Sequence, residues 1–229
     1  MSQLSLSVRL RDEATFENYY TGSQQALVAQ LQNLCVKPQQ SERLLYVWGS
    51  IGRSHLLQAT CWQFEQQGER SLYLPLVEVL AHGPTLLEGA DQCALVCIDD
   101  IHLLAGQLQW QETIFHLFNR VRDEGRCLLL SSNCAPRDLT FELADLCSRL
   151  SQMLIFHVPN LSDENKLSAL QLRAHKRGLE LSDEVGRFIL SRGERSMQSL
   201  FFILEQLDQQ SLQAQRKLTI PFIKEVLCW

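Results

Sequence analysis

The sequence lacks the features of a membrane protein, of a secreted protein and of a protein that binds nucleic acid through its charge. No apolar run approaches the roughly 18 residues that a membrane-spanning helix requires. The amino terminus has no basic segment followed by an apolar one, so no secretory signal is visible. Basic residues form no block and the net charge is −5, whereas domains that bind nucleic acid usually carry a basic patch. We therefore expect a cytoplasmic protein with protein partners, no membrane contact and no direct sequence-specific DNA binding.

Closely paired cysteines are missing as well. Eight cysteines are scattered over the 229 residues, several of them inside apolar runs, and none forms a C-x-x-C pair. Buried, reduced thiols are the simplest interpretation, which agrees with a cytoplasmic location. With 45% hydrophobic and 21% charged residues, the chain has the composition of a globular protein, and its length allows one large core or one large and one small.

Short apolar strands alternate with helical segments over the first two thirds of the chain. Helical spacing predicts a first helix that includes residues 25–31 and ends before Pro38. It predicts two further helices over 54–67 and 110–124, which are ended by Gly68 and Gly125. The predicted strands are residues 44–48, 71–75, 94–98, 127–131 and 154–158. This alternation predicts an α/β fold with a parallel, five-stranded sheet between helices.

After Pro159 only helical periodicity remains. It predicts helices that include residues 166–170, 185–190 and 197–212, and a last helix that begins near Thr219 with Pro221 in its first turn. We therefore expect a flexible tail over 1–12, an α/β domain over 13–159 and a small all-α domain over 160–229.

A phosphate-binding loop is predicted where the first strand meets the next helix. The loop reads Gly49-Ser50-Ile51-Gly52-Arg53-Ser54 and is followed by His55. Backbone N–H groups of such a loop surround phosphates, the basic residue contacts them and the hydroxyl binds Mg²⁺. The usual spacing is G-x-x-x-x-G-K-[ST], so this loop is two residues short and has arginine in place of lysine. Taken alone, the segment could equally be a strand-to-helix turn without a ligand.

Two further strands end in polar residues. Asp99 and Asp100 follow the apolar run 94–98, as expected if the first carboxylate binds Mg²⁺ and the second orients water. A solvated acidic strand end is the alternative. Asn133 follows the run 127–131 and is a candidate for orienting the attacking water, or an ordinary turn residue.

These segments together resemble the AAA+ core of the DnaA family. The resemblance covers nearly the whole chain and also includes residues 15–22, 135–139 and 146–150. Within that family the chain is most similar to the Hda-type homologues that inactivate the initiator, through the Gly-Arg-Ser-His loop, residues 161–174 and 214–222, and the tail. The resemblance implies an AAA+ nucleotide-binding domain followed by a helical lid domain.

The resemblance also assigns roles to residues outside the loop. Phe16, Tyr19 and Tyr20 match a segment that packs near the nucleotide base, although a buried aromatic staple would look the same. Arg149 matches the arginine finger, which contacts the γ-phosphate held by a neighbouring subunit; the alternative is a surface arginine that caps a helix end.

Several departures from the family pattern predict weak or absent intrinsic hydrolysis. The phosphate loop is short, Asn133 stands where relatives often have an acid, and Gln198 stands where the lid has a sensor arginine, with Arg195 one turn earlier as a substitute. We therefore expect ADP or another nucleoside diphosphate such as CDP, with Mg²⁺ held by Ser54, Asp99 and Asp100 if it binds.

The tail contains a candidate peptide for the sliding clamp of DNA polymerase III. Its residues are Gln3, Leu4, Leu6 and Val8, which resemble the glutamine and apolar anchors of clamp-binding peptides. Here the peptide ends in Ser7-Val8 rather than in Pro-Leu or phenylalanine, and such short matches also occur by chance.

The sequence therefore leads to one main functional hypothesis and two alternatives. The main hypothesis is a regulator that docks on the clamp, stimulates hydrolysis of ATP bound to the DnaA initiator through Arg149 and so prevents re-initiation. Self-association into a homo-oligomer is a further expectation. The alternatives are an independently acting AAA+ ATPase, similar to a helicase loader, and a scaffold of the same fold that binds no nucleotide.

Overall fold

The structure is a computed structural model that describes residues 14–49 and 51–229. The chain divides into two units, one up to Asn160 and one over Leu161–Trp229, next to the 159/160 boundary expected from the sequence. Each unit is described by itself. Among the described residues, no helix combines the length and the apolar character needed to cross a bilayer.

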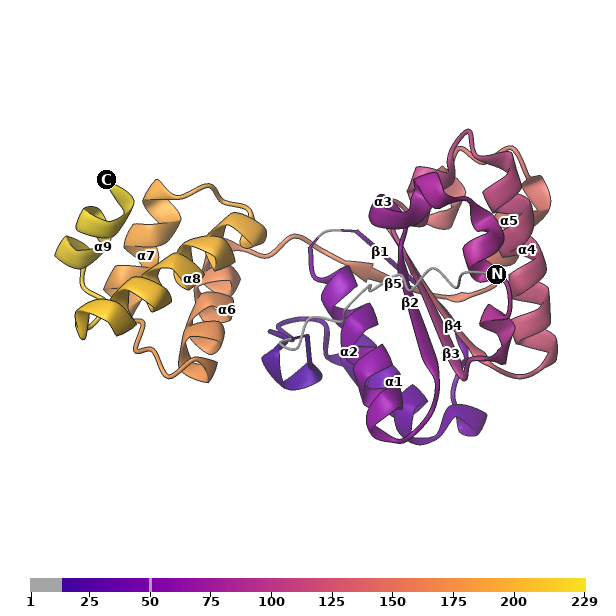
Figure 1. The fold of residues 1–229 in the computed structure, drawn as a ribbon, viewed down its shortest axis with the longest axis horizontal. Helices are drawn as coiled ribbons and strands as arrows, with labels where there is room; N and C mark the ends of the chain where they lie inside the picture. Colours follow the sequence, from indigo (N-terminus) through magenta and orange to yellow (C-terminus); the bar gives the residue numbers. More distant parts are fainter. Residues whose placement is uncertain (1–13, 50) are drawn as a thin grey trace. The chain divides into compact units, whose positions relative to one another are not determined.

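The first unit is built on a parallel sheet of five strands in the order β2-β3-β4-β1-β5 (Figure 1). The predicted parallel α/β fold is therefore confirmed. The strands are β1 Leu44–Gly49, β2 Ser71–Pro75, β3 Leu95–Asp99, β4 Cys127–Ser132 and β5 Leu154–Val158. Every strand lies within one residue of its predicted position, and β3 includes Asp99, which the sequence analysis had placed after the strand.

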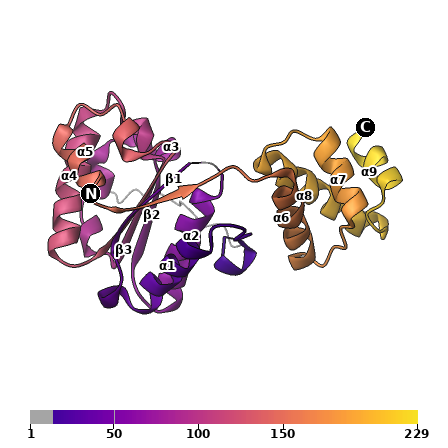
Figure 2. The ribbon, with the colours of Figure 1, turned by 180° about the vertical axis from the view of Figure 1, so that it is seen from behind.

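Two hydrophobic clusters cover the two faces of this sheet. Because side chains alternate along a strand, Leu128 and Leu130 of β4 point into one cluster and Leu129 into the other. Helices α1 (Gln25–Val36) and α2 (Arg53–Gln66) pack on the Leu129 face. Helices α3 (Leu76–Val79), α4 (Leu108–Asp123) and α5 (Ala144–Leu150) lie on the opposite face (Figures 1 and 2).

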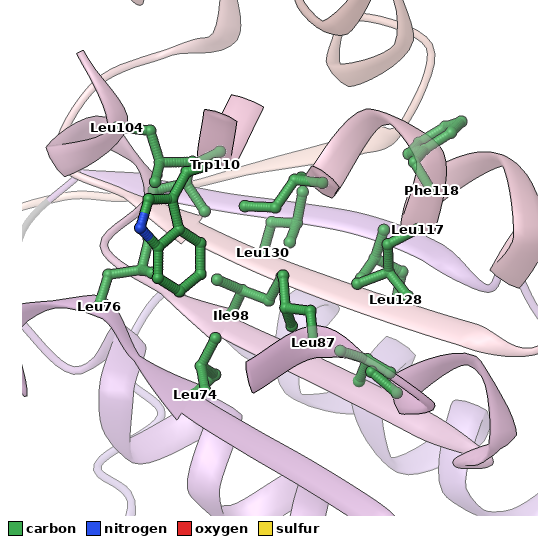
Figure 3. Close-up of a cluster of buried hydrophobic side chains, with 14 of the residues drawn as sticks. Leu74, Leu76, Leu87, Ile98, Leu104, Trp110, Leu117, Phe118, Leu128 and Leu130 are labelled. Atoms are coloured by element: carbon green, nitrogen blue, oxygen red, sulfur yellow. The ribbon is translucent and has the colours of Figure 1, made fainter. Parts of the chain in front are cut away.

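The cluster on the α4 face contains the large side chains drawn in Figure 3. Trp110 of α4 lies over Leu76, Leu104 and Ile98, and its indole N–H donates to the Leu80 carbonyl at 3.2 Å. Leu117 of the same helix lies near Leu128. The apolar stripe of the predicted helix is therefore the stripe that α4 buries, although the helix begins at Leu108 rather than at Trp110.

The sequence analysis missed the short helical turns. Residues 76–92 hold α3 and the 3₁₀ turns η3 Leu80–His82, η4 Pro84–Leu87 and η5 Ala90–Gln92, and α5 was not predicted as a helix. Each is too short to show a helical period. The other 3₁₀ turns are η1 Phe16–Asn18, η2 Pro38–Gln40, η6 Ile101–Leu104 and η7 Pro136–Asp138.

The second unit is all helical, as predicted. Its helices are α6 Asp163–Lys176, α7 Asp183–Arg192, α8 Met197–Ala214 and α9 Ile220–Leu227. A hydroxyl side chain caps the start of each helix by accepting the backbone N–H of the residue three positions further along the chain. These caps are Ser162, Ser182, Ser196 and Thr219. Such caps satisfy N–H groups that a helix leaves unpaired.

Candidate nucleotide site

The phosphate loop lies between β1 and α2 and depends on its two glycines. Gly49 has φ 119° and Gly52 has φ 107°, a backbone region that other residues rarely adopt. A Cβ at Gly49 would overlap the Val158 carbonyl of the neighbouring strand, and one at Gly52 would lie 3.1 Å from the Tyr19 ring. Helix α2 begins at Arg53, one residue earlier than predicted, and Ile51 is exposed at the tip. Ser50 lies outside the described residues.

Arg53 is folded back onto its own loop. One guanidinium nitrogen donates to the Gly49 carbonyl, and the other lies 2.9 Å from an Asp100 carboxylate oxygen. Both side chains are largely buried, with 14% and 25% of their surface exposed. A phosphate that binds the same guanidinium nitrogen therefore competes with the Asp100 carboxylate. The hydroxyl of Ser54, the next residue, is half-buried in the first turn of α2.

Asp99 is buried at the end of β3 and accepts hydrogen bonds at both carboxylate oxygens. The Tyr73 hydroxyl donates to one oxygen at 2.7 Å and the Ser131 hydroxyl donates to the other. The Gln58 amide in turn donates to the Tyr73 hydroxyl at 3.2 Å. Burial, and next the Asp99 charge, raise the pKa of Tyr73, so this hydroxyl stays a donor. With 3% of its surface exposed, Asp99 is not a solvated strand end.

Asp100 occupies a left-handed conformation, with φ 61° and ψ 46°. Its backbone N–H donates to the Ser131 hydroxyl at 2.9 Å, which ties the ends of β3 and β4 together. His102 Nδ1 lies 3.9 Å from the Asp100 carboxylate and accepts the Asn133 backbone N–H at 3.4 Å. Burial lowers the pKa of His102, and the opposing effect of Asp100 is smaller. Asn133 itself is exposed at this edge of the sheet.

Of the predicted aromatic residues, Tyr19 lies beside the phosphate loop. His55 of α2 lies 2.7 Å from the Thr15 carbonyl through Nε2, and its ring centroid is 5.4 Å from that of Tyr19. Phe16 and Tyr19 are partly buried against the cluster beneath α1 and α2. Burial raises the pKa of Tyr19 to about 12. The segment 15–19 is therefore fixed to the start of α2, and Tyr20 follows it, half-buried.

The carboxylates and hydroxyls of this edge are the hard oxygen donors that Mg²⁺ prefers. Asp100 and Ser54 are partly accessible, whereas both Asp99 oxygens already accept hydroxyl groups. Within residues 14–49 and 51–229, no group of three or more His, Cys, Asp or Glu side chains could hold a metal ion without other ligands. A magnesium ion here would thus depend on phosphate oxygens and water to complete its shell.

Arg149 lies away from these residues, in the last turn of α5. The chain then enters β5 at Leu154, which pairs with Leu45 near the start of β1, so the end of α5 lies at the amino edge of the sheet. The phosphate loop follows the carboxyl edge, and a strand of this length spans roughly 17–20 Å. Arg149 is half-buried, and no hydrogen bond or ion pair of its side chain occurs among the residues that the structure describes.

The remaining predicted residues belong to the second unit or lie outside the described residues. Arg195 lies in the second unit, 71% exposed and 3.7 Å from Asp163, and Gln198 is in the first turn of α8. Their role at the phosphate loop stays a prediction. Gln3, Leu4, Leu6 and Val8 lie outside the described residues.

Sequence analysis missed several residues that shape the site. Tyr73, Gln58 and His102 gave no signal, because the first two stand in an ordinary strand and helix and His102 stands in a short 3₁₀ turn. Ser131 could have been found, since it lies near the carboxyl end of β4, which neighbours the strand of Asp99, and carboxyl ends of parallel strands meet at one edge.

Two family models match separate parts of this chain. A family model described as the lid domain of Hda matches residues 163–227, and one described as the ATPase domain of bacterial DnaA matches residues 84–157. Domain III of the replication initiation protein DnaA from Thermotoga maritima has a similar structure, with a TM-score of 0.78 and 22% identity over 96% of this chain and 97% of that chain.

Two further solved structures show how widely the fold is shared. AMPPCP-bound DnaA from Aquifex aeolicus gives a TM-score of 0.73 at 21% identity, over 89% of this chain and 68% of that chain. The RuvB Holliday junction branch migration motor of Thermotoga maritima gives a TM-score of 0.60 at 12% identity, over 90% of this chain and 67% of that chain. At these identities the structural likeness establishes the fold.

Proposed function

The chain is an Hda-like, DnaA-homologous AAA+ protein, and on this premise we propose that it inactivates the replication initiator. It docks on the sliding clamp of DNA polymerase III and presents Arg149 to the ATP of a neighbouring DnaA molecule. The initiator then passes to its ADP form, and re-initiation is prevented.

The position of Arg149 is the observation that carries this proposal. Its guanidinium has no partner among the described residues, and it lies at the edge of the sheet opposite its own phosphate loop. An arginine in this position suits a phosphate held by another subunit. A finger supplied in trans is worth ~10³–10⁵ in rate, because it stabilises charge on the transferring phosphoryl group.

The protein's own nucleotide site serves binding rather than turnover in this proposal. Arg53 turns from Asp100 to the phosphates of a nucleoside diphosphate, ADP or CDP, while Gly49 and Gly52 let the backbone approach. Phe16, Tyr19 and Tyr20 offer aromatic faces near the base. Magnesium, where bound, would be held by Ser54 and Asp100 with the carboxylate of Asp99, and would neutralise phosphate charge.

The clamp contact rests on the sequence of the tail alone. Gln3 supplies an amide for hydrogen bonds, and Leu4, Leu6 and Val8 supply apolar anchors for a preformed groove. The net charge of −5 and the absence of a basic block favour this protein contact over direct binding to DNA.

Turnover of initiator-bound ATP in the presence of clamp-loaded DNA tests the proposal. We expect the protein to accelerate that turnover, and the acceleration to require the clamp. A scaffold of the same fold would bind the clamp without acceleration, and an independent ATPase would hydrolyse ATP with neither partner present. Either of these two results would reject the proposed function.

A further inference from the structure

Gln111 is a polar residue that is fully buried on the apolar face of α4. Its relative exposure is 0%. The side-chain amide nitrogen donates to the Leu104 carbonyl at 2.8 Å and to the Glu142 carboxylate. The amide oxygen accepts the backbone N–H groups of Glu142 and Leu143, each at 3.0 Å. A glutamine amide has two N–H donors and two acceptor positions, so the hydrogen-bonding capacity of Gln111 is fully used.

These contacts join two loops that are distant in the sequence. Leu104 ends η6, the turn that follows Asp99 and Asp100, and Glu142 precedes α5. The second carboxylate oxygen of Glu142 accepts the Gly106 backbone N–H at 3.1 Å. The hydrogen bond from Gln111 is the largest of the effects that hold the pKa of Glu142 below its ordinary value, so this carboxylate remains an acceptor.

Helix α5 depends on this connection because its own start has no local cap. Leu143 occupies the N-cap position and makes no side-chain hydrogen bond there, where Ser, Thr, Asp or Asn would usually stand. Gln111 instead fixes the two backbone N–H groups that lead into the helix. Leu146 and Leu150 bury one side of α5 in the core, and Arg149 is carried on the same two turns.

We propose that Gln111 is a positioning residue for the arginine finger. It fixes the entry of α5 against α4 and thereby sets where the Arg149 guanidinium meets the partner's γ-phosphate. The inference rests on the proposed function of Arg149. Six residues, or about 9 Å of helix, separate Leu143 from Arg149. A small tilt at the helix start is therefore enough to move the guanidinium, and a misplacement of about 1 Å can cost ~10²-fold in rate.

The test replaces Gln111 with methionine (Gln111→Met), which has similar length but neither donors nor strong acceptors. We expect the maximal stimulated rate of ATP hydrolysis to fall by ~10-fold or more, while the concentration for half-maximal stimulation changes less than about twofold. Amide hydrogen exchange over residues 142–150 should become faster. Glu142→Gln replaces one of the two acceptor oxygens by an N–H₂ group, so it loses the contact with Gln111 or with Gly106. It leaves the three hydrogen bonds of Gln111 to backbone groups intact and should therefore lower the rate less than Gln111→Met does.

Thr60→Val is the matched control. Thr60 is fully buried in α2, on the other face of the sheet, and its hydroxyl donates to the Leu56 carbonyl at 2.7 Å. This control removes a buried hydrogen bond without touching α5, so it should leave the stimulated rate and the exchange over 142–150 unchanged. An equal fall in rate for Thr60→Val and Gln111→Met would show a general loss of stability and overturn the positioning role.

Arg149→Ala, measured beside these variants, separates the two claims. If it abolishes stimulation while Gln111→Met behaves like the parent, only the positioning role is overturned. Unchanged hydrogen exchange over 142–150 in Gln111→Met overturns it as well, without any use of the partner. If Arg149→Ala stimulates as the parent does, the finger assignment fails, and no finger is left for Gln111 to position.

Discussion

At the scale of single residues, two neighbouring carboxylates occupy different environments. Asp99 is buried and held by two hydroxyl donors, whereas Asp100 pairs with Arg53 and is partly exposed. A buried carboxylate is costly unless its oxygens are hydrogen-bonded. Tyr73 and Ser131 therefore contribute to stability, and Asp100 is the carboxylate that is free to exchange its partner when a ligand arrives.

Tyr73→Phe tests this difference. We expect the free energy of unfolding to fall by about 1.5–3 kcal/mol, because the lost hydrogen bond goes to a charged group. Tyr46→Phe is the matched control, since the Tyr46 hydroxyl donates to the neutral Cys134 carbonyl at 3.0 Å and its loss should cost only about 0.5–1.5 kcal/mol. Urea denaturation of both variants measures the difference. Equal costs would contradict a charged acceptor at Tyr73.

His102 makes stability depend on pH at the same edge of the sheet. Burial lowers its pKa in the folded protein, so the unfolded chain binds a proton more readily as pH falls below about 6.5. The folded protein should therefore lose stability as the pH falls from about 6.5 to the lowered pKa of His102 in the folded state. Between pH 7 and pH 5 the unfolding free energy of the parent should therefore fall more than that of His102→Gln. A difference that stays constant over this range would refute the argument.

At the scale of elements, we expect the phosphate loop to set the preference between nucleoside diphosphates and triphosphates. The loop has two residues fewer than the usual spacing, and Arg53 already contacts Gly49 and Asp100. Few donors then remain for a γ-phosphate. We expect calorimetry to give tighter binding of ADP or CDP than of ATP. Clearly tighter ATP binding, or intrinsic turnover at a rate typical of enzymes, would contradict this expectation.

Elements with a clear hydrophobic periodicity, or with a glycine that marks their end, could be predicted from the sequence. The strands at 44–48 and 71–75 and the helix at 197–212 were all found, because continuous apolar runs and apolar stripes report burial directly. Helix α5 could not be found, because seven residues make two turns. Its start is fixed by Gln111, a contact over some thirty positions that no local pattern reveals.

Part of the candidate site could likewise be predicted from sequence patterns, and part arises only from the fold. The phosphate loop and the acidic strand end have their own sequence patterns, and the parallel sheet brings them to one edge. The ion pair between Arg53 and Asp100 arises only when β1 and β3 both lie beside β4, and the hydroxyl groups around Asp99 are brought to it by β2 and β4. Sequence spacing therefore predicted that these segments meet at one edge of the sheet but not how their charges are satisfied.

At the scale of the whole molecule, clamp docking and the finger should be separable. Replacing Leu4 and Leu6 with alanine removes apolar anchors worth about 1.5–3 kcal/mol each when fully buried. Clamp binding should then drop below detection, while the melting temperature and nucleotide binding stay unchanged. Arg149→Ala serves as the control that keeps the tail intact. A double variant that binds the clamp as the parent does would reject the docking assignment.

The central claim is that Arg149 acts on ATP held by another molecule, and one measurement tests it most directly. Turnover of DnaA-bound ATP is followed in the presence of clamp-loaded DNA, with the parent, Arg149→Ala and Arg149→Lys. Our account predicts that Arg149→Ala abolishes the stimulation yet keeps clamp binding and stability, because the side chain makes no hydrogen bond or ion pair within the described part of its own chain. Arg149→Lys should restore little, since lysine lacks the planar pair of donors. Stimulation by Arg149→Ala at the parental rate would contradict the account.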